Sequence, residues 1–169
     1  MRLLPDLITR YVLAIIVAAA SAWFFVVIGP LTLWLSSVFI KMFYPVTLLS
    51  DGFVFKNIVL QFIPACAAIP AYILLGLLVL TTRNLLWGDR WLLWLMGSFL
   101  ILLINVFRIL LLTIILFTGG KNWFDAVHIF FWHVVASFMV VVIWWWLIKK
   151  FKIKSIPLVD DVRFLRKLF

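Results

Sequence analysis

The sequence lacks glutamate entirely, has a single cysteine, and carries charge on only 12% of its 169 residues. Its acidic residues are Asp6, Asp51, Asp89, Asp125, Asp160 and Asp161. None lies in the middle of an apolar run, which argues against proton-coupled pumps and intramembrane aspartyl proteases, because both need carboxylates at that depth. The lone cysteine excludes an intrachain disulfide.

Apolar residues are abundant instead, at 67% of the chain. Much of this excess lies in runs that are long enough to cross a bilayer, which takes ~20 residues. These runs are Tyr11–Ile28, Ile58–Leu80, Trp91–Phe117 and Ala126–Ile148. A shorter run, Pro30–Phe43, predicts an interfacial or re-entrant helix. The expected fold class is therefore all-α: a polytopic transmembrane helix bundle of about four spans plus one such helix, forming a single integral membrane domain over residues 1–169.

The N-terminal run has a second interpretation. Arg2 and Arg10 precede an apolar stretch that ends at Ala20-Ser21-Ala22, a pattern that resembles a signal peptide with its small-residue cleavage site. The apolar stretch continues through Trp23–Ile28 and so reaches spanning length, which favours a retained helix.

The net charge of +9 comes largely from the end of the chain. Basic residues that follow the last apolar run are Lys149, Lys150, Lys152, Lys154, Arg163, Arg166 and Lys167. This distribution is typical of the positive-inside rule and of attraction to anionic membrane lipids, rather than of nucleic-acid binding. We therefore expect a multi-pass protein of the plasma membrane, with both termini and the basic tail 149–169 in the cytoplasm.

Arg108 is the only charged residue within Trp91–Phe117. An arginine inside a span costs on the order of 3 kcal/mol and usually marks a functional site. At 1.5 Å per residue, Arg108 and Cys66 each lie roughly 12–13 Å from the outer end of their runs, and His128 stands at the outer start of the last run. A thiol becomes a nucleophile as the thiolate, which a cation or an imidazole base promotes. Arginine can also bind an oxyanion.

Two further residues support this predicted site. Asn105 precedes Arg108 by three residues and Asp125 precedes His128 by three, so each pair shares a helix face. His133 is an alternative to His128, although it lies roughly 140° further around the helix. That spacing also argues against a metal site on one helix, and no cofactor is expected.

Each of these residues also fits a purely structural role. A lone cysteine among alanines packs well in a membrane helix, an arginine can anchor carbonyls, and histidines pack at the interface. The alternative function is a non-enzymatic small membrane protein, either a transporter subunit or an assembly partner. A lipid-modifying acyltransferase would share the thioester chemistry.

The order of these residues resembles that in the archaeosortase/exosortase family, over about Tyr44 to Ile148. The matching segments are Pro64-Ala65-Cys66-Ala67, Asn105-Val106-Phe107-Arg108-Ile109 and Asp125-Ala126-Val127-His128. Many members have a glycine two residues after the cysteine, where this chain has Ala68, and a glycine four residues after the histidine, where it has Trp132.

The resemblance implies a membrane-embedded cysteine peptidase and transpeptidase with its active site near the outer face. Cys66, Arg108 and His128 would be catalytic. Such an enzyme would cleave the C-terminal hydrophobic helix and basic tail from exported proteins and transfer the new carboxyl end to a lipid or envelope acceptor.

Overall fold

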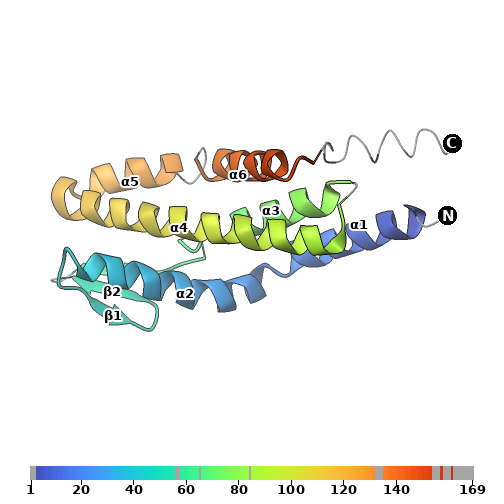
Figure 1. Cartoon of the computed structure of the whole chain (residues 1–169). Helices are drawn as coiled ribbons and strands as arrows, with labels where there is room; N and C mark the ends of the chain where they lie inside the picture. Colours follow the sequence, from blue (N-terminus) through green and yellow to red (C-terminus); the bar gives the residue numbers. More distant parts are fainter. Residues whose placement is uncertain are drawn as a thin grey trace.

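The computed structural model describes residues 3–55, 58–64, 66–83, 85–131, 135–153, 157 and 161. Most of them are helical, which confirms the expected all-α class, but a small antiparallel sheet is also present (Figure 1). The helices are α1 (Leu3–Ala19), α2 (Ser21–Lys41), α3 (Ile69–Thr81), α4 (Trp87–Gly119), α5 (Lys121–Phe130) and α6 (Ala136–Lys150). The strands are β1 (Thr47–Leu49), β2 (Gly52–Phe55) and β3 (Ile58–Gln61).

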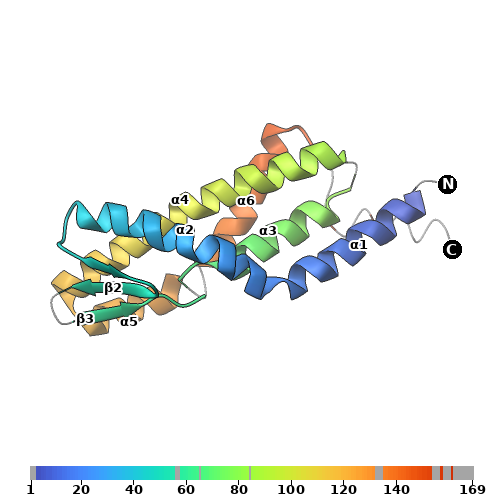
Figure 2. The same ribbon diagram turned by 90° about the horizontal axis from the view of Figure 1, so that it is seen from below.

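Most of the helices run along a common long direction, and α6 crosses them obliquely (Figure 2). α1 begins at one end, and α2 continues to the opposite end, where the sheet lies (Figures 1 and 2). α3 runs back from the sheet, α4 extends along the whole bundle, and α5 and α6 return beside it. Both the beginning of α4 and the beginning of α1 therefore lie at the end of the bundle away from the sheet.

The predicted boundaries of the first span and of the interfacial helix were wrong. The helix breaks at Ala20, between α1 and α2, instead of at Gly29-Pro30. Pro30 lies inside α2. Helices in apolar surroundings tolerate proline where neighbouring groups satisfy the backbone. The break at Ala20 lets α1 pack on α3 while α2 reaches α4, as the bend in Figure 2 shows.

The third predicted span is confirmed as one helix and is longer than expected. α4 has 33 residues and contains an 18-residue stretch with a mean hydropathy of 2.8, and α2 has 21 residues and contains an 18-residue stretch with a mean hydropathy of 2.0. Within the described part of the chain, these are the two helices long and apolar enough to cross a membrane. At 1.5 Å per residue, α4 is roughly 50 Å long, which exceeds the ~30 Å of a bilayer's hydrocarbon core.

The predicted span Ile58–Leu80 is divided into a strand, a turn and a helix. β3 ends at Gln61, and α3 begins at Ile69 with Pro70 in its first turn. Proline is favoured at that position, because the first N–H groups of a helix have no partner within it. A short apolar strand cannot be told from a helix by hydrophobicity alone. For this reason β3 and α3 were predicted together as one span.

The unpredicted sheet is a meander in the order β1-β2-β3. Phe53 pairs with Leu48 on one side and with Leu60 on the other. Gly52 is required for this close pairing, since a Cβ there would lie 2.1 Å from the Leu60 carbonyl oxygen. Phe53 and Val46 form a buried cluster with residues of α2 and α4, which fixes the sheet against the end of the bundle.

The described residues of the last predicted span, Ala126–Ile148, lie in α5 and α6 and at the π-helical positions Phe131 and Val135 between them. α5 packs on α4, whereas α6 packs on both α3 and α4. His133 lies between these helices, outside the described residues, as does most of the predicted tail.

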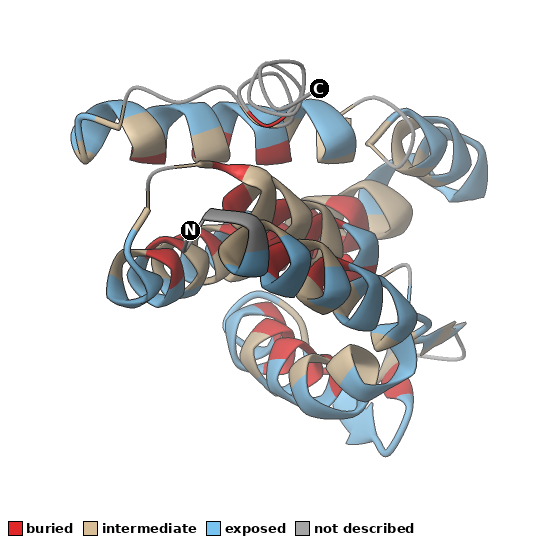
Figure 3. Cartoon of the chain, turned by 90° about the vertical axis from the view of Figure 1, so that its right-hand side faces the viewer, coloured by how far each residue is buried: buried red, intermediate tan, exposed pale blue. Residues whose placement is uncertain are grey.

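The main core lies between α3, α4 and α6. It includes Tyr72, Leu75, Ile101 and Val140, and Figure 3 shows the buried positions facing the interior of the bundle. Large apolar side chains cover much of the outside instead, among them Trp23 at 76% and Phe99 at 60% exposure.

A polar cluster closes the end of the bundle away from the sheet. Arg10 and Asp161 form a buried ion pair at 2.9 Å, and Asp6 lies 3.1 Å from Arg10 Nε. Arg90 donates to the carbonyls of Val79 and Leu80, which terminate α3. Arg10 and Arg90 therefore have structural roles at this end of the bundle.

Candidate active site

The turn that carries Cys66 joins β3 to α3. The Cys66 N–H donates to the Ile63 carbonyl at 2.8 Å, and Ala68 has the left-handed conformation, with φ of 54°. Glycine adopts this conformation most readily. Many members of the archaeosortase/exosortase family, which this chain resembles, have glycine at the position of Ala68. Cys66 is therefore on a turn at the start of α3 and not within a spanning helix, which corrects its predicted position.

α4 delivers two of the predicted side chains to this turn. The Asn105 side-chain amide donates to the Cys66 carbonyl at 2.7 Å, across 39 residues of sequence. Arg108, one helical turn later, is 7% exposed and interacts electrostatically with Cys66. Asn105 thus fixes the backbone at Cys66, while Arg108 supplies positive charge beside the thiol.

α5 brings His128 to the same place. The imidazole stacks on Phe124, with ring centroids 5.5 Å apart and an interplanar angle of 22°. His128 Nδ1 is buried, and no described residue forms a hydrogen bond with it. Asp125, which was predicted to share the helix face of His128, forms no hydrogen bond with Nδ1 and is exposed, although it interacts electrostatically with His128.

The charge state of His128 follows from these surroundings. α5 has ten residues and is too short to cross a bilayer. Burial lowers the pKa of His128 below its ordinary value, and the positive charge of Arg108 lowers it further, while Asp125 opposes the shift. The imidazole is therefore neutral at pH 7 and able to accept a proton.

Cys66, Arg108 and His128 line a single cavity of about 70 Å³. Gln61 and Phe62 of the β3 end also line it. Three predicted site residues from different parts of the chain thus meet at one place, next to the sheet. The arrangement combines a nucleophile, a cation and a proton acceptor.

Among the lining residues that were not predicted from the sequence are Phe124 and Gln61. Phe124 could have been recognised, because it precedes His128 by four residues and so shares its helix face. Gln61 carries no comparable signal, since its role depends on a strand that was taken for part of a helix. Among the described residues, no group of three or more histidine, cysteine or acidic side chains could hold a metal ion.

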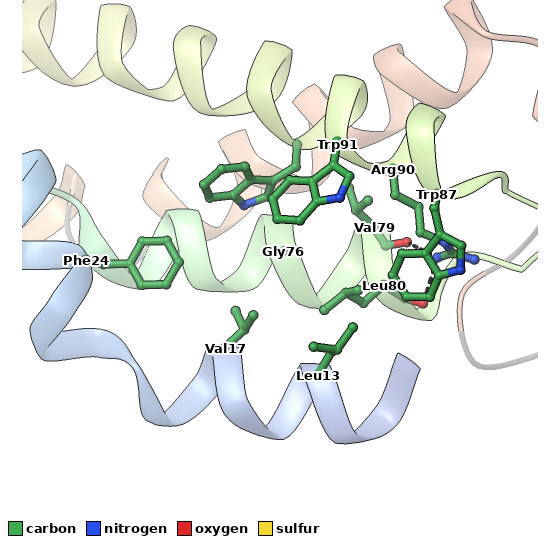
Figure 4. A pocket seen from close by; sticks show the side chains of 10 residues that line it. Leu13, Val17, Phe24, Gly76, Val79, Leu80, Trp87, Arg90 and Trp91 are labelled. Atoms are coloured by element: carbon green, nitrogen blue, oxygen red, sulfur yellow. Dashed lines mark hydrogen bonds between the residues drawn. The ribbon is translucent and has the colours of Figure 1, made fainter. Parts of the chain in front are cut away.

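A second pocket lies at the far end of α4 (Figure 4). Leu13, Val17 and Phe24 face Trp91 across it, and its lining is almost entirely apolar. Arg90 points towards its edge, with its guanidinium 5.3 Å from the Trp87 ring and bonded to helix carbonyls. This pocket holds no nucleophile or base, so the cavity at Cys66 is the better candidate for chemistry.

Comparisons with known protein families, with curated proteins and with solved structures found no match for this chain. The function must therefore be inferred from the site itself.

Proposed function

We propose that this chain is a multi-pass membrane cysteine peptidase and transpeptidase. The observation that carries the proposal is the shared cavity of Cys66, Arg108 and His128. The resemblance to the archaeosortase/exosortase family, which rests on the same three residues and Asn105, supports it.

The lengths of the helices support a site near one face of the membrane. Arg108 lies 21 residues after Trp87, the first residue of α4, or roughly 31 Å along the helix axis. This distance is about one hydrocarbon thickness. If Trp87 and Trp91 lie at the cytoplasmic interface, where tryptophan is enriched, then Arg108 reaches the outer interface and the sheet lies outside.

The proposed reaction begins with proton transfer from the Cys66 thiol to neutral His128. The thiolate attacks a peptide carbonyl of the substrate, and Arg108 stabilises the developing oxyanion. The carbon–nitrogen bond then breaks, the imidazolium protonates the leaving amine, and a thioester remains on Cys66. An acceptor amine or hydroxyl, or water, then gives a proton to His128 as it attacks the thioester. The carbon–sulfur bond breaks, the acyl group remains on the acceptor, and His128 passes that proton to the Cys66 thiolate.

The proposed substrates are exported proteins with a C-terminal hydrophobic helix and a basic tail. The helix would lie in the membrane beside this bundle, with its basic flank in the cytoplasm and its scissile bond at the outer interface. The acceptor would be a lipid or an envelope component at that interface.

The test is co-expression with candidate substrates from the same genome, followed by measurement of substrate mass. The wild-type protein should shorten or modify a substrate, and Cys66→Ala should abolish this while leaving the fold intact. Normal processing by Cys66→Ala would reject the proposal. Arg108→Lys should also fail, because a compact ammonium does not reproduce the planar guanidinium.

A further inference from the structure

The edge of β3 leads directly to the candidate nucleophile. β3 is the last strand in the order β1-β2-β3, so one of its edges has no neighbouring strand among the described residues. Phe62, immediately after β3, lines the same cavity as Cys66. This continuity raises the question of what the open edge binds.

The direction of the backbone groups along β3 follows from the pairing with β2. The Phe62 N–H donates to the Asp51 carbonyl at 2.7 Å, and the Leu60 carbonyl is directed at Gly52. Because successive residues of an antiparallel strand alternate between the two edges, Val59 and Gln61 direct their N–H and C=O groups away from β2.

Both residues that carry these outward backbone groups are exposed to solvent. Val59 is 65% exposed, and Gln61 is also exposed. None of the described residues forms a hydrogen bond with the outward backbone groups of either one. An open strand edge of this kind is a template for an added strand.

We infer that an extended peptide binds along β3 as an added strand, pairing with Val59 and Gln61 so that its next carbonyl reaches Cys66. This inference rests on the proposed function and specifies the conformation of the substrate: the segment before the scissile bond is extended, not helical. From Val59 to Ile63 the edge covers about 13 Å at 3.3 Å per residue, which fits about five substrate residues.

The test uses the fact that Cys66 is the only cysteine in the chain. The intact protein in detergent is alkylated with acetyl-pentaalanine chloromethyl ketone and, separately, with iodoacetamide. In the first reaction the thiolate displaces chloride and forms a carbon–sulfur bond. The measured quantity is the ratio of the two alkylation rates, divided by the same ratio for N-acetylcysteine.

Val59→Pro and Gln61→Pro each remove one outward N–H and leave the bonds to β2 in place, as proline at a strand edge allows. We expect each variant to lower the normalised ratio about fivefold, since a net hydrogen bond contributes on the order of 1 kcal/mol. Leu48→Pro is the matched control: by the same alternation, Leu48 directs its N–H outward on β1, the opposite edge. It should keep the wild-type ratio.

A normalised ratio near one for the wild type, or equal ratios in Val59→Pro and Leu48→Pro, would overturn the inference. Iodoacetamide rates serve as a check on folding for Val59→Pro and Leu48→Pro, whose altered residues do not line the cavity at Cys66, and these two rates should not differ. The outcome is separate from the substrate-processing test: processing that depends on Cys66 but withstands Val59→Pro and Gln61→Pro would reject the edge and retain the enzyme.

Discussion

Removing the hydrogen bond from Asn105 to the Cys66 carbonyl should impair both catalysis and stability. Asn105 is 3% exposed, and its amide donates to that carbonyl at 2.7 Å. Asn105→Ala removes the donor and leaves the turn at Cys66 without its attachment to α4. Asn105→Asp keeps the side-chain shape, but an ionised carboxylate cannot donate a hydrogen bond.

The magnitude follows from the bond and from the geometry it fixes. Loss of the bond, with a carbonyl left unsatisfied, costs about 1–3 kcal/mol of stability. A displacement of the nucleophile by ~1 Å can cost ~100-fold in rate. We therefore expect kcat for substrate processing to fall between ten- and a hundredfold in both variants, with a smaller change in KM, because the substrate-binding edge at β3 is unchanged.

The assay compares kcat, KM and thermal unfolding for the wild type and both variants. Ser98→Ala is the matched control, because Ser98 lies two turns earlier on the same face of α4 and its hydroxyl has no described hydrogen-bond partner. The control should keep wild-type kcat. Wild-type kcat in Asn105→Asp would refute the positioning role, and a loss equal in Ser98→Ala would mean that α4 packing alone matters.

Three further predictions concern stability, each measured by thermal unfolding. Because the pKa of His128 is lowered in the folded protein, the unfolded chain binds a proton at this residue before the folded chain does as pH falls below about 6.5. The free energy of unfolding should therefore decrease from pH 7 to pH 5, and it should decrease less in His128→Phe. Ala68→Gly should change the free energy of unfolding by less than about 0.5 kcal/mol, because glycine adopts the left-handed conformation without strain and this gain offsets the lost methyl group. Ala71→Gly, at an equally buried but helical position, should lower it by more than about 1 kcal/mol. Asp161→Asn should cost about 3–5 kcal/mol by leaving Arg10 buried with a weaker partner, and the double variant Arg10→Met with Asp161→Leu should recover part of that loss.

Several features were predictable from the sequence because they depend on local composition. α4 follows from one uninterrupted apolar run, and Arg108 stands out as its only charge. Cys66 and His128 were predicted to meet Arg108 from depth alone, and all three line one cavity. The residues of the candidate site could therefore be predicted from the sequence more closely than the helices, strands and turns on which they lie.

The remaining features depend on contacts distant in sequence. β3 and α3 form one apolar run, and only pairing with β2 shows where the strand ends. Pro30 is compatible with either a helix end or a helix interior, and the packing of α2 along α4 selects the interior. Asn105 was placed on the face of Arg108, but its bond to the Cys66 carbonyl depends on a turn that hydrophobicity does not reveal.

The pairing of Arg10 with Asp161 links residues that are 151 positions apart. During synthesis at ~5–20 residues per second, Arg10 must wait roughly 8–30 s before its carboxylate partner leaves the ribosome. Each helix from α1 to α6 precedes Asp161 in the chain. The end of the bundle away from the sheet can therefore reach its final form only after α6 has been made, while the turn at Cys66 and its contacts on α4 form from segments that emerge earlier.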